Sequence, residues 1–122
     1  MHKKTIIVGA SPNKSRFAYL AAESLSEYGN EFVPVGIKRG EVLGRPILDI
    51  RTSPHIEGTD TITLYIRPAL QLEWESYLLS LKPKRIIFNP GTENSEFEKR
   101  ADALGIETLE VCTLVMLRTG QY

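Results

Sequence analysis

The segment that most constrains the fold is residues 5–16, Thr-Ile-Ile-Val-Gly-Ala-Ser-Pro-Asn-Lys-Ser-Arg. Four consecutive β-branched residues predict a buried strand over residues 5–8, because a strand covered on both faces shows no polar alternation. The apolar spacing from Phe17 to Tyr28 then predicts a helix that ends at Gly29. A strand, a tight turn and a helix N-terminus in this order present unpaired backbone N–H groups to a phosphate. The segment therefore predicts a phosphate-binding loop.

The rest of the chain alternates strand and helix patterns. The strand patterns lie at residues 32–37, 61–66, 85–88 and 106–111, and the helical stripes at residues 70–81 and 92–104. This alternation with short loops predicts an α/β fold, a single doubly wound domain over residues 1–122 with a five-stranded, mainly parallel sheet and helices on both faces. Residues 42–48 are predicted to form an extended excursion with a turn at Gly44. Pro34 counts against a central position for its strand, or indicates an irregularity there.

Composition narrows the class of protein. Lys plus Arg equals Asp plus Glu at 15 each, which gives no reason to expect nucleic acid or an anionic membrane as a partner. No apolar run approaches the ~20 residues of a membrane span, and the N-terminus does not resemble a secretory signal. The single cysteine fits a reducing compartment, so we expect a cytoplasmic protein. Positive charge is nevertheless concentrated on the phosphate loop, because no acid precedes Glu23.

Ligands of doubly wound sheets lie at the carboxyl ends of the strands. The first loop at this edge has only Gly9 of the glycines in the dinucleotide fingerprint G-x-G-x-x-G. Ser11 and Asn13 add polar side chains, and Arg16 is placed to bind a phosphate with two of its guanidinium nitrogens. An ordinary strand–helix turn with a surface arginine is an equally good interpretation of this loop taken alone.

The second loop distinguishes between cofactors. NAD-binding domains place an acid at the end of the second strand to bind the ribose hydroxyls, whereas this chain has Gly36-Ile-Lys38-Arg39. The cations favour an additional phosphate on the ribose, as in NADP or coenzyme A, although a solvated charged turn is the alternative. Pro68 after Arg67 suits a helix start, and Gly91 allows a ligand to approach the backbone closely.

Candidate catalytic residues are few. His2 and His55 have no recognisable base or nucleophile partner in the sequence. Cys112 falls at the ligand edge after the fifth strand, where a buried structural cysteine is a more common finding than a nucleophile. No cluster of His, Cys, Asp or Glu has metal-ligand spacing. We therefore expect no catalytic residue and no metal site.

Taken together, these loops resemble those of the stand-alone CoA-binding domain proteins, which are similar to the N-terminal domain of the succinyl-CoA synthetase alpha subunit. The resemblance covers essentially the whole chain and rests on the order of several segments. These are residues 8–16, 33–38 (Val-Pro-Val-Gly-Ile-Lys), 43–46 (Leu-Gly-Arg-Pro), 65–69 (Tyr-Ile-Arg-Pro-Ala) and Cys112. Two departures are the Asn-Pro-Gly-Thr loop at 89–92, where many members have Leu-Gly, and Glu-Val before Cys112, where Asp-Arg is common.

The resemblance implies a Rossmann-like fold with coenzyme A across the carboxyl edge of the sheet. It implies that Lys38 meets the ribose phosphate, that the first loop faces the pyrophosphate and adenosine, and that Arg67 and Pro68 lie beside the adenine. The cofactor-binding residues predicted in this way are Gly9, Ala10, Ser11, Pro12, Asn13, Arg16, Gly36, Lys38, Arg67, Pro68 and Gly91.

The function predicted from these observations is binding of coenzyme A or an acyl-CoA without chemistry of its own. An NADP-binding oxidoreductase or subunit is the first alternative, motivated by the same cations at residues 38 and 39. A protein-interaction module without ligand is the second. A homodimer or a partner enzyme fits any of the three.

Overall fold

Six strands form one parallel sheet in the computed structural model, which describes residues 3–122. Neighbouring strands pair in the order β5-β2-β1-β6-β7-β8, so the chain winds outward from β1 in both directions. The strands are β1 (Thr5–Val8), β2 (Phe32–Gly36), β5 (Leu48–Asp49), β6 (Thr61–Leu64), β7 (Arg85–Phe88) and β8 (Glu107–Leu109). The predicted doubly wound α/β fold is thereby confirmed.

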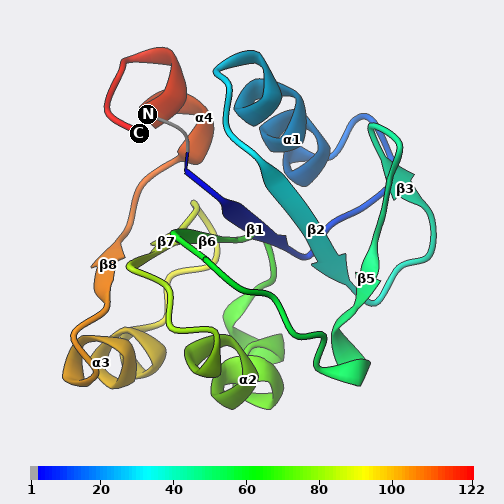
Figure 1. Ribbon diagram of the computed structural model, residues 1–122. Coiled ribbons are helices and arrows are strands. Elements are labelled where there is room, and N and C mark those ends of the chain that lie inside the picture. The colour runs from blue at the N-terminus through cyan, green and yellow to red at the C-terminus, as the bar shows by residue number, and fades with distance from the viewer. Residues whose placement is uncertain (1–2) are drawn as a thin grey trace.

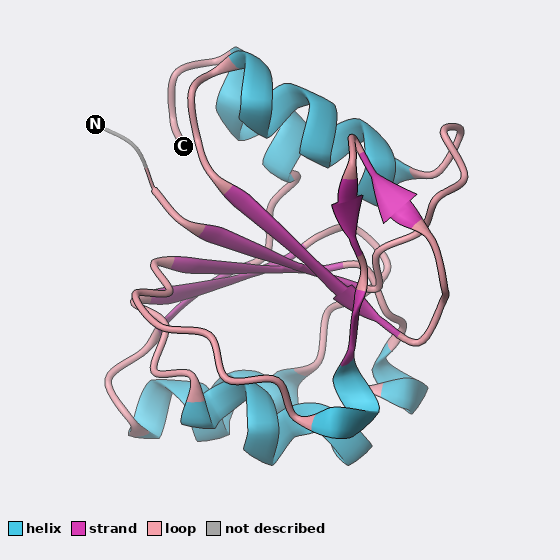
Figure 2. Cartoon of the chain, turned by 45° about the vertical axis from the view of Figure 1, so that its right-hand side comes forward, coloured by secondary structure: helices cyan, strands magenta, loops and turns pink. Residues whose placement is uncertain are grey.

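Helices cover both faces of the sheet (Figures 1 and 2). On one face lie α1 (Phe17–Glu27) and α4 (Thr113–Arg118), and on the other α2 (Glu75–Ser80) and α3 (Ser95–Ala103). Short 3-10 turns occupy Ile50–Thr52, Pro68–Leu70 and Leu72–Trp74. None of the helices within residues 3–122 is long and apolar enough to cross a membrane.

The strand alternation divides the core into two layers. In β1, Ile7 packs with Leu25 of α1 and Leu117 of α4, whereas Ile6 and Val8 belong to the opposite layer with α2 and α3. That second layer includes an edge-to-face pair of Phe88 and Phe97, with ring centroids 5.5 Å apart. Because both layers exclude water, Ile6, Ile7 and Val8 of β1 are all buried, as the consecutive β-branched residues predicted.

The sheet has one strand more than the predicted five. Residues 42–48 do not form a single excursion: β3 (Glu41–Val42) and β4 (Arg45–Pro46) pair as a separate antiparallel hairpin, and the chain then returns to add β5 beside β2. A strand of two residues is too short to show a hydrophobic period, so the sequence pattern did not reveal it.

Pro34 lies within β2 although β2 has neighbours on both sides. The carbonyls of Glu31 and Val35 accept hydrogen bonds from backbone nitrogens of residues 5 and 9, on the β1 side. Successive residues of a parallel strand point their backbone groups to opposite sides, so the nitrogen of Pro34 faces β5. There β5 pairs only with Val35 and Gly36. Pro34 therefore removes no ladder hydrogen bond, because β2 is locally an edge at this position.

The close approach of the β1 turn to β6 gives the first testable prediction. Gly9 has a φ of +93°, and a Cβ there would lie 2.9 Å from Ile66 Cγ2 and 3.1 Å from the Tyr65 carbonyl carbon. Gly91 has a φ of +94° but nothing within 4 Å of the same position, which makes it a matched control. Gly91→Ala should cost about 1 kcal/mol of unfolding free energy through backbone strain alone. Gly9→Ala should cost a further ~1–3 kcal/mol through overpacking.

Urea unfolding of the two variants measures the difference. Equal losses of stability would show that the approach of Tyr65 and Ile66 to Gly9 imposes no steric requirement.

A second prediction concerns pH. Burial of the Glu98 carboxyl and its contact with Glu110 raise the pKa of Glu98 to about 7. The folded state therefore holds this proton more tightly than the unfolded state, in which the pKa is about 4.3. The stabilisation is fully present below that lower value and is lost as pH rises through about 7.

Glu98→Gln should accordingly be more stable than the wild type at pH 8 and similar to it at pH 4, measured by thermal unfolding at both values. Glu96→Gln, on the exposed part of the same helix, is the control and should leave the pH dependence unchanged. A pH profile of Glu98→Gln parallel to that of the wild type would contradict the assignment.

Candidate functional site

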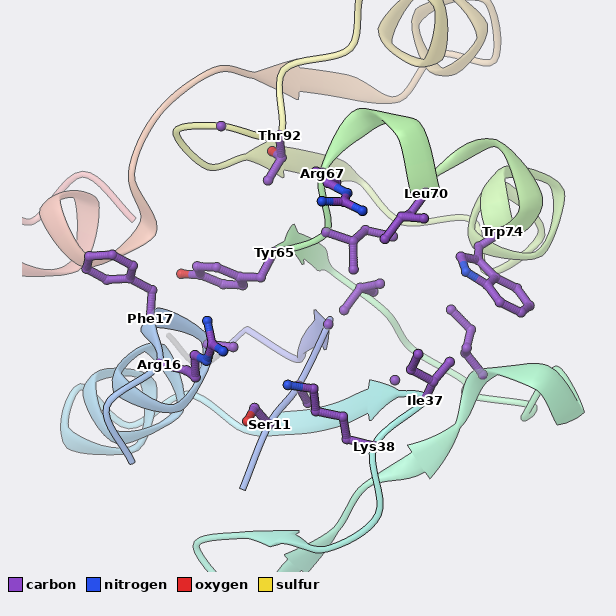
Figure 3. Close-up of a pocket in the computed structure, with 18 of the residues that line it drawn as sticks. Ser11, Arg16, Phe17, Ile37, Lys38, Tyr65, Arg67, Leu70, Trp74 and Thr92 are labelled. Atoms are coloured by element: carbon purple, nitrogen blue, oxygen red, sulfur yellow. The ribbon is translucent and has the colours of Figure 1, made fainter. Parts of the chain in front are cut away.

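A cleft of about 690 Å³ opens at the carboxyl ends of β1, β2, β6 and β7 (Figure 3). This volume lies in the range of small-molecule sites. The cleft brings together residues from four loops that are far apart in the sequence. Of the residues predicted to bind the cofactor, those that line it are Gly9, Ala10, Ser11, Arg16, Gly36, Lys38, Arg67 and Gly91. Their contact with a ligand stays a prediction.

Three other predicted residues do not line the cleft but shape its loops. The Asn13 side chain accepts hydrogen bonds from the Ser15 backbone nitrogen (3.0 Å) and hydroxyl (2.7 Å). Pro12 packs where Gly40 approaches it, since a Cβ on Gly40 would lie 3.0 Å from the Pro12 Cβ. Pro68 begins the 3-10 turn after β6. All three residues are exposed to solvent outside the cleft lining.

In the phosphate loop, the N–H groups at the start of α1 are unpaired, whereas those of the turn at Gly9 and Ala10 are hydrogen-bonded. The Gly9 and Ala10 nitrogens both donate to the Val35 carbonyl, at 3.0 and 3.1 Å, and are therefore occupied. The first turn of α1 differs: Phe17 and Ala18 line the cleft, and their N–H groups have no acceptor among residues 3–122. Arg16 occupies the N-cap without a side-chain hydrogen bond, and the first turn contains no acid. An anion at this helix start would meet unpaired N–H groups and the positive end of the helix dipole.

Gly36 holds the second loop against the first. A Cβ on Gly36 would lie 3.2 Å from the Ala10 nitrogen and 3.3 Å from its oxygen, closer than a side chain normally approaches a backbone. The glycine thus allows the end of β2 to lie directly beside the β1 turn. Lys38 reaches the same cleft as α1 for this reason.

Positive charge dominates the cleft. Arg16, Lys38 and Arg67 are exposed, and none of them forms a salt bridge with another described residue. Figure 3 shows these three side chains around the middle of the cleft, on different elements. Glu73 is the single carboxylate of the lining. Cations without protein partners keep their full charge for a ligand.

Apolar side chains form two walls beside these cations (Figure 3). On one side, near Trp74, Ile37 and Leu70 expose 58% and 49% of their surface. On the other side, Phe17 exposes 68% of its surface near Tyr65. Such exposure of large apolar groups in a concave site is typical of ligand binding.

Sequence reasoning missed these walls. Phe17, Leu70 and Trp74 were assigned to the buried stripes of two helices, but Phe17 and Leu70 are exposed in the structure. Phe17 and Leu70 are each the first residue of an apolar stripe, at the edge of the sheet where a ligand is expected. This position in the sequence is the signal that would have distinguished them from core residues. The N-cap of α1 is Arg16, and Asn94 caps α3 by accepting from the Phe97 nitrogen at 3.1 Å.

Polar groups beneath the cleft fix its floor. The Asn89 side chain donates to the Leu64 carbonyl (2.8 Å) and to the Thr63 hydroxyl (2.7 Å) and accepts from the Thr113 nitrogen (2.9 Å). This one residue therefore ties the end of β7 to β6 and to the start of α4. The sequence suggested only a turn at this position.

Tyr65 contributes a ring to the cleft and no reactive group. Its hydroxyl is enclosed near Thr63 and Thr113, whose hydroxyls bond to each other at 2.8 Å. It has no hydrogen bond of good geometry, and burial raises the pKa of Tyr65 to about 12. The phenol is therefore protonated at neutral pH.

The other residues considered for catalysis lie elsewhere. His55 pairs with Glu57 at 3.2 Å in an exposed segment, and half-buried Cys112 precedes α4 outside the cleft lining. His2 lies outside the described residues. Across residues 3–122 no group of His, Cys, Asp and Glu is arranged to hold a metal ion.

Solved structures share this architecture. An uncharacterised protein of known crystal structure has 57% sequence identity and a TM-score of 0.95, with 100% of this chain and 99% of that chain covered. A hypothetical protein from Pyrococcus horikoshii OT3 has 28% identity and a TM-score of 0.84, with 97% and 83% covered. A protein from Thermus thermophilus, at 20% identity and a TM-score of 0.82 over 99% and 91% of the two chains, shows the fold alone. No protein of curated function matches the chain.

The family comparison agrees with the geometry of the cleft. The model of the CoA binding domain matches residues 3–118, which is nearly the whole chain. The resemblance that the sequence motifs suggested is thereby confirmed. The chain belongs to the CoA binding domain family and has a Rossmann-like fold.

Proposed function

We propose that the protein binds coenzyme A, free or acylated, in this cleft and contributes no catalytic step of its own. The observation that carries the proposal is the meeting of two features in one cleft. These are the uncapped start of α1 and the cationic end of β2, where Lys38 stands in place of an acid. Coenzyme A has a phosphate for each of them, a pyrophosphate and a separate ribose phosphate.

The donor set fits the phosphates of the cofactor. The Phe17 and Ala18 N–H groups and the Arg16 guanidinium suit the pyrophosphate, because backbone amides and arginine bind such oxygens directionally. Lys38 suits the ribose phosphate as a flexible point charge. The three cations of the lining face a single carboxylate, Glu73, so the cleft attracts a polyanion.

The two apolar walls fit the remaining parts of the cofactor. The adenine ring matches the slot between Ile37 and Leu70, where Trp74 also lies. The pantetheine arm matches the path past Phe17 and Tyr65 toward Gly91. There is open space at Gly91, since no atom outside residues 90–92 lies within 4 Å of the position that its Cβ would occupy.

The chemistry of the lining supports a binding role over a catalytic one. Tyr65 keeps its proton at neutral pH, because burial raises its pKa to about 12. Glu73 has no second acid or base beside it among the described lining residues. General acid–base catalysis requires a group whose pKa lies near the working pH. The protein then serves as a carrier, a sensor or a partner of another enzyme.

A comparison of four ligands tests the proposal. Calorimetry and thermal shift are performed with CoA, dephospho-CoA, NADP and NAD, and quenching of the single tryptophan, Trp74, reports occupancy of the cleft. We expect CoA to bind most tightly and to stabilise the fold by about 2.7 kcal/mol at a hundredfold excess over Kd.

Two other outcomes would contradict the proposal. Binding of NADP without CoA would overturn the proposal in favour of an oxidoreductase or its subunit. No response to any of the four ligands would favour an interaction module, which co-purification of a partner protein would support.

The role of Lys38 gives a separate prediction. Lys38→Ala should abolish the preference for CoA over dephospho-CoA, because the loss of one charge-assisted contact of about 1.5–3 kcal/mol lowers the CoA affinity roughly 10- to 150-fold. Lys14→Ala is the control, because Lys14 carries the same charge nearby but does not line the cleft. Calorimetric titrations of both variants with both ligands measure the preference. A preference retained in Lys38→Ala would place the ribose phosphate elsewhere.

A further inference from the structure

We infer that Gln71 is a positioning residue that fixes the separation of two loops lining the cleft, the loop after β6 and the loop after β7. The inference rests on the proposed function, because its readout is ligand affinity. Gln71 does not line the cleft and is fully buried, with 0% of its surface exposed. It is one of the largest fully buried side chains of the protein, and the only polar one among them in the described chain.

The side-chain nitrogen of Gln71 reaches both loops. Its Nε2 donates to the Ile66 carbonyl and to the Thr92 carbonyl, each at 2.8 Å. Ile66 and Thr92 both line the cleft, on separate loops. One amide group therefore holds the two loops at a fixed separation. We call these two hydrogen bonds the Gln71 bridge.

The oxygen of the same amide fixes its orientation. Gln71 Oε1 accepts from Asn94 Nδ2 at 2.9 Å, and Asn94 Oδ1 caps α3. Rotation of the amide by half a turn would place Oε1 against two carbonyl oxygens and Nε2 against the Asn94 amino group. The network therefore admits one orientation, with both amide hydrogens used.

Each loop supports itself without the bridge. The turn after β6 keeps the Leu70 N to Arg67 O and Gln71 N to Pro68 O hydrogen bonds, at 3.0 and 3.1 Å. In the loop after β7, the Thr92 nitrogen and hydroxyl both donate to the Asn89 carbonyl, at 2.9 and 2.8 Å. Loss of the bridge would therefore leave both loops formed but free to separate.

This separation matters only to a ligand that contacts both loops. Adenosine 3′,5′-bisphosphate carries the adenine and ribose phosphate of coenzyme A but lacks the pantetheine arm, so it does not reach Gly91. Coenzyme A, with its pantetheine arm, is long enough to contact both loops. The bridge therefore affects the affinity for the whole cofactor more than the affinity for its nucleotide part.

Calorimetry of Gln71→Leu with these two ligands tests the inference. We expect the CoA affinity to fall roughly tenfold, the loss of about one buried hydrogen bond, and that for the bisphosphate by less than about threefold. Ile106→Ala, buried outside the cleft, is the stability control and should leave both affinities unchanged.

Gln71→Glu adds a readout that general destabilisation would not produce. The groups in contact with this side chain are two backbone carbonyls and the Asn94 amide, none of which titrates. An ionised carboxylate repels both carbonyls, whereas the protonated acid donates to one of them. The ratio of CoA affinity in Gln71→Glu to that in the wild type should therefore rise as pH falls from 8 to 5, while the ratio for Gln71→Leu stays constant.

The outcomes separate the two claims. If the wild type binds neither ligand, the proposed function is wrong. If the wild type binds both and Gln71→Leu weakens both equally, the proposed function stands and the bridge does not position the two loops for the whole cofactor. A pH-independent ratio for Gln71→Glu would contradict the bridge in the same way, even if Gln71→Leu did not fold.

Discussion

The contact on which the cleft depends is the meeting of the β1 turn with the end of β2. One carbonyl, that of Val35, accepts from two successive amides, Gly9 and Ala10, at 3.0 and 3.1 Å. The backbones can approach this closely because Gly36 and Gly9 lack side chains that would strike Ala10, Tyr65 and Ile66.

Two consequences follow from this contact. The Gly9 and Ala10 amides are used for folding, so the N–H groups left unpaired on this side of the cleft include those of the first turn of α1. The end of β2 is also drawn inward until Lys38 faces the same cleft as Arg16. The backbone groups that join the two loops are therefore different from the groups that are candidates for binding a ligand, although both sets lie in the same short loops.

The sequence predicted the fold well because its main signals are local and repeated. The β-branched run of β1 and the glycine ends of α1 and α3 mark their elements without knowledge of the tertiary structure. The element that was missed, β5, has two residues and depends on the hairpin before it to bring it beside β2. Pro34 was a correct warning of irregularity, since β2 lacks a partner on one side at that residue.

The candidate site was less predictable from the sequence, for a physical reason. Cations and glycines are recognisable by residue type, and eight of the eleven predicted residues line the cleft. The apolar walls were hidden because exposed Phe17 and Leu70 continue the spacing of buried stripes. Gln71 and Asn89 gave no signal, because their hydrogen-bond partners lie far away in the sequence and come near only in the folded sheet.

The lack of protein partners around Lys38 has a consequence for evolution. Its ammonium group is exposed and forms no salt bridge with any described residue, so the fold does not depend on its charge. Substitutions of Lys38 should therefore alter the charge of the cleft while the stability of the fold stays nearly constant. At Gly36, two positions earlier, almost any change would disturb the backbone of the neighbouring loop. Gly36 is therefore constrained by folding, whereas Lys38, two residues later, is not.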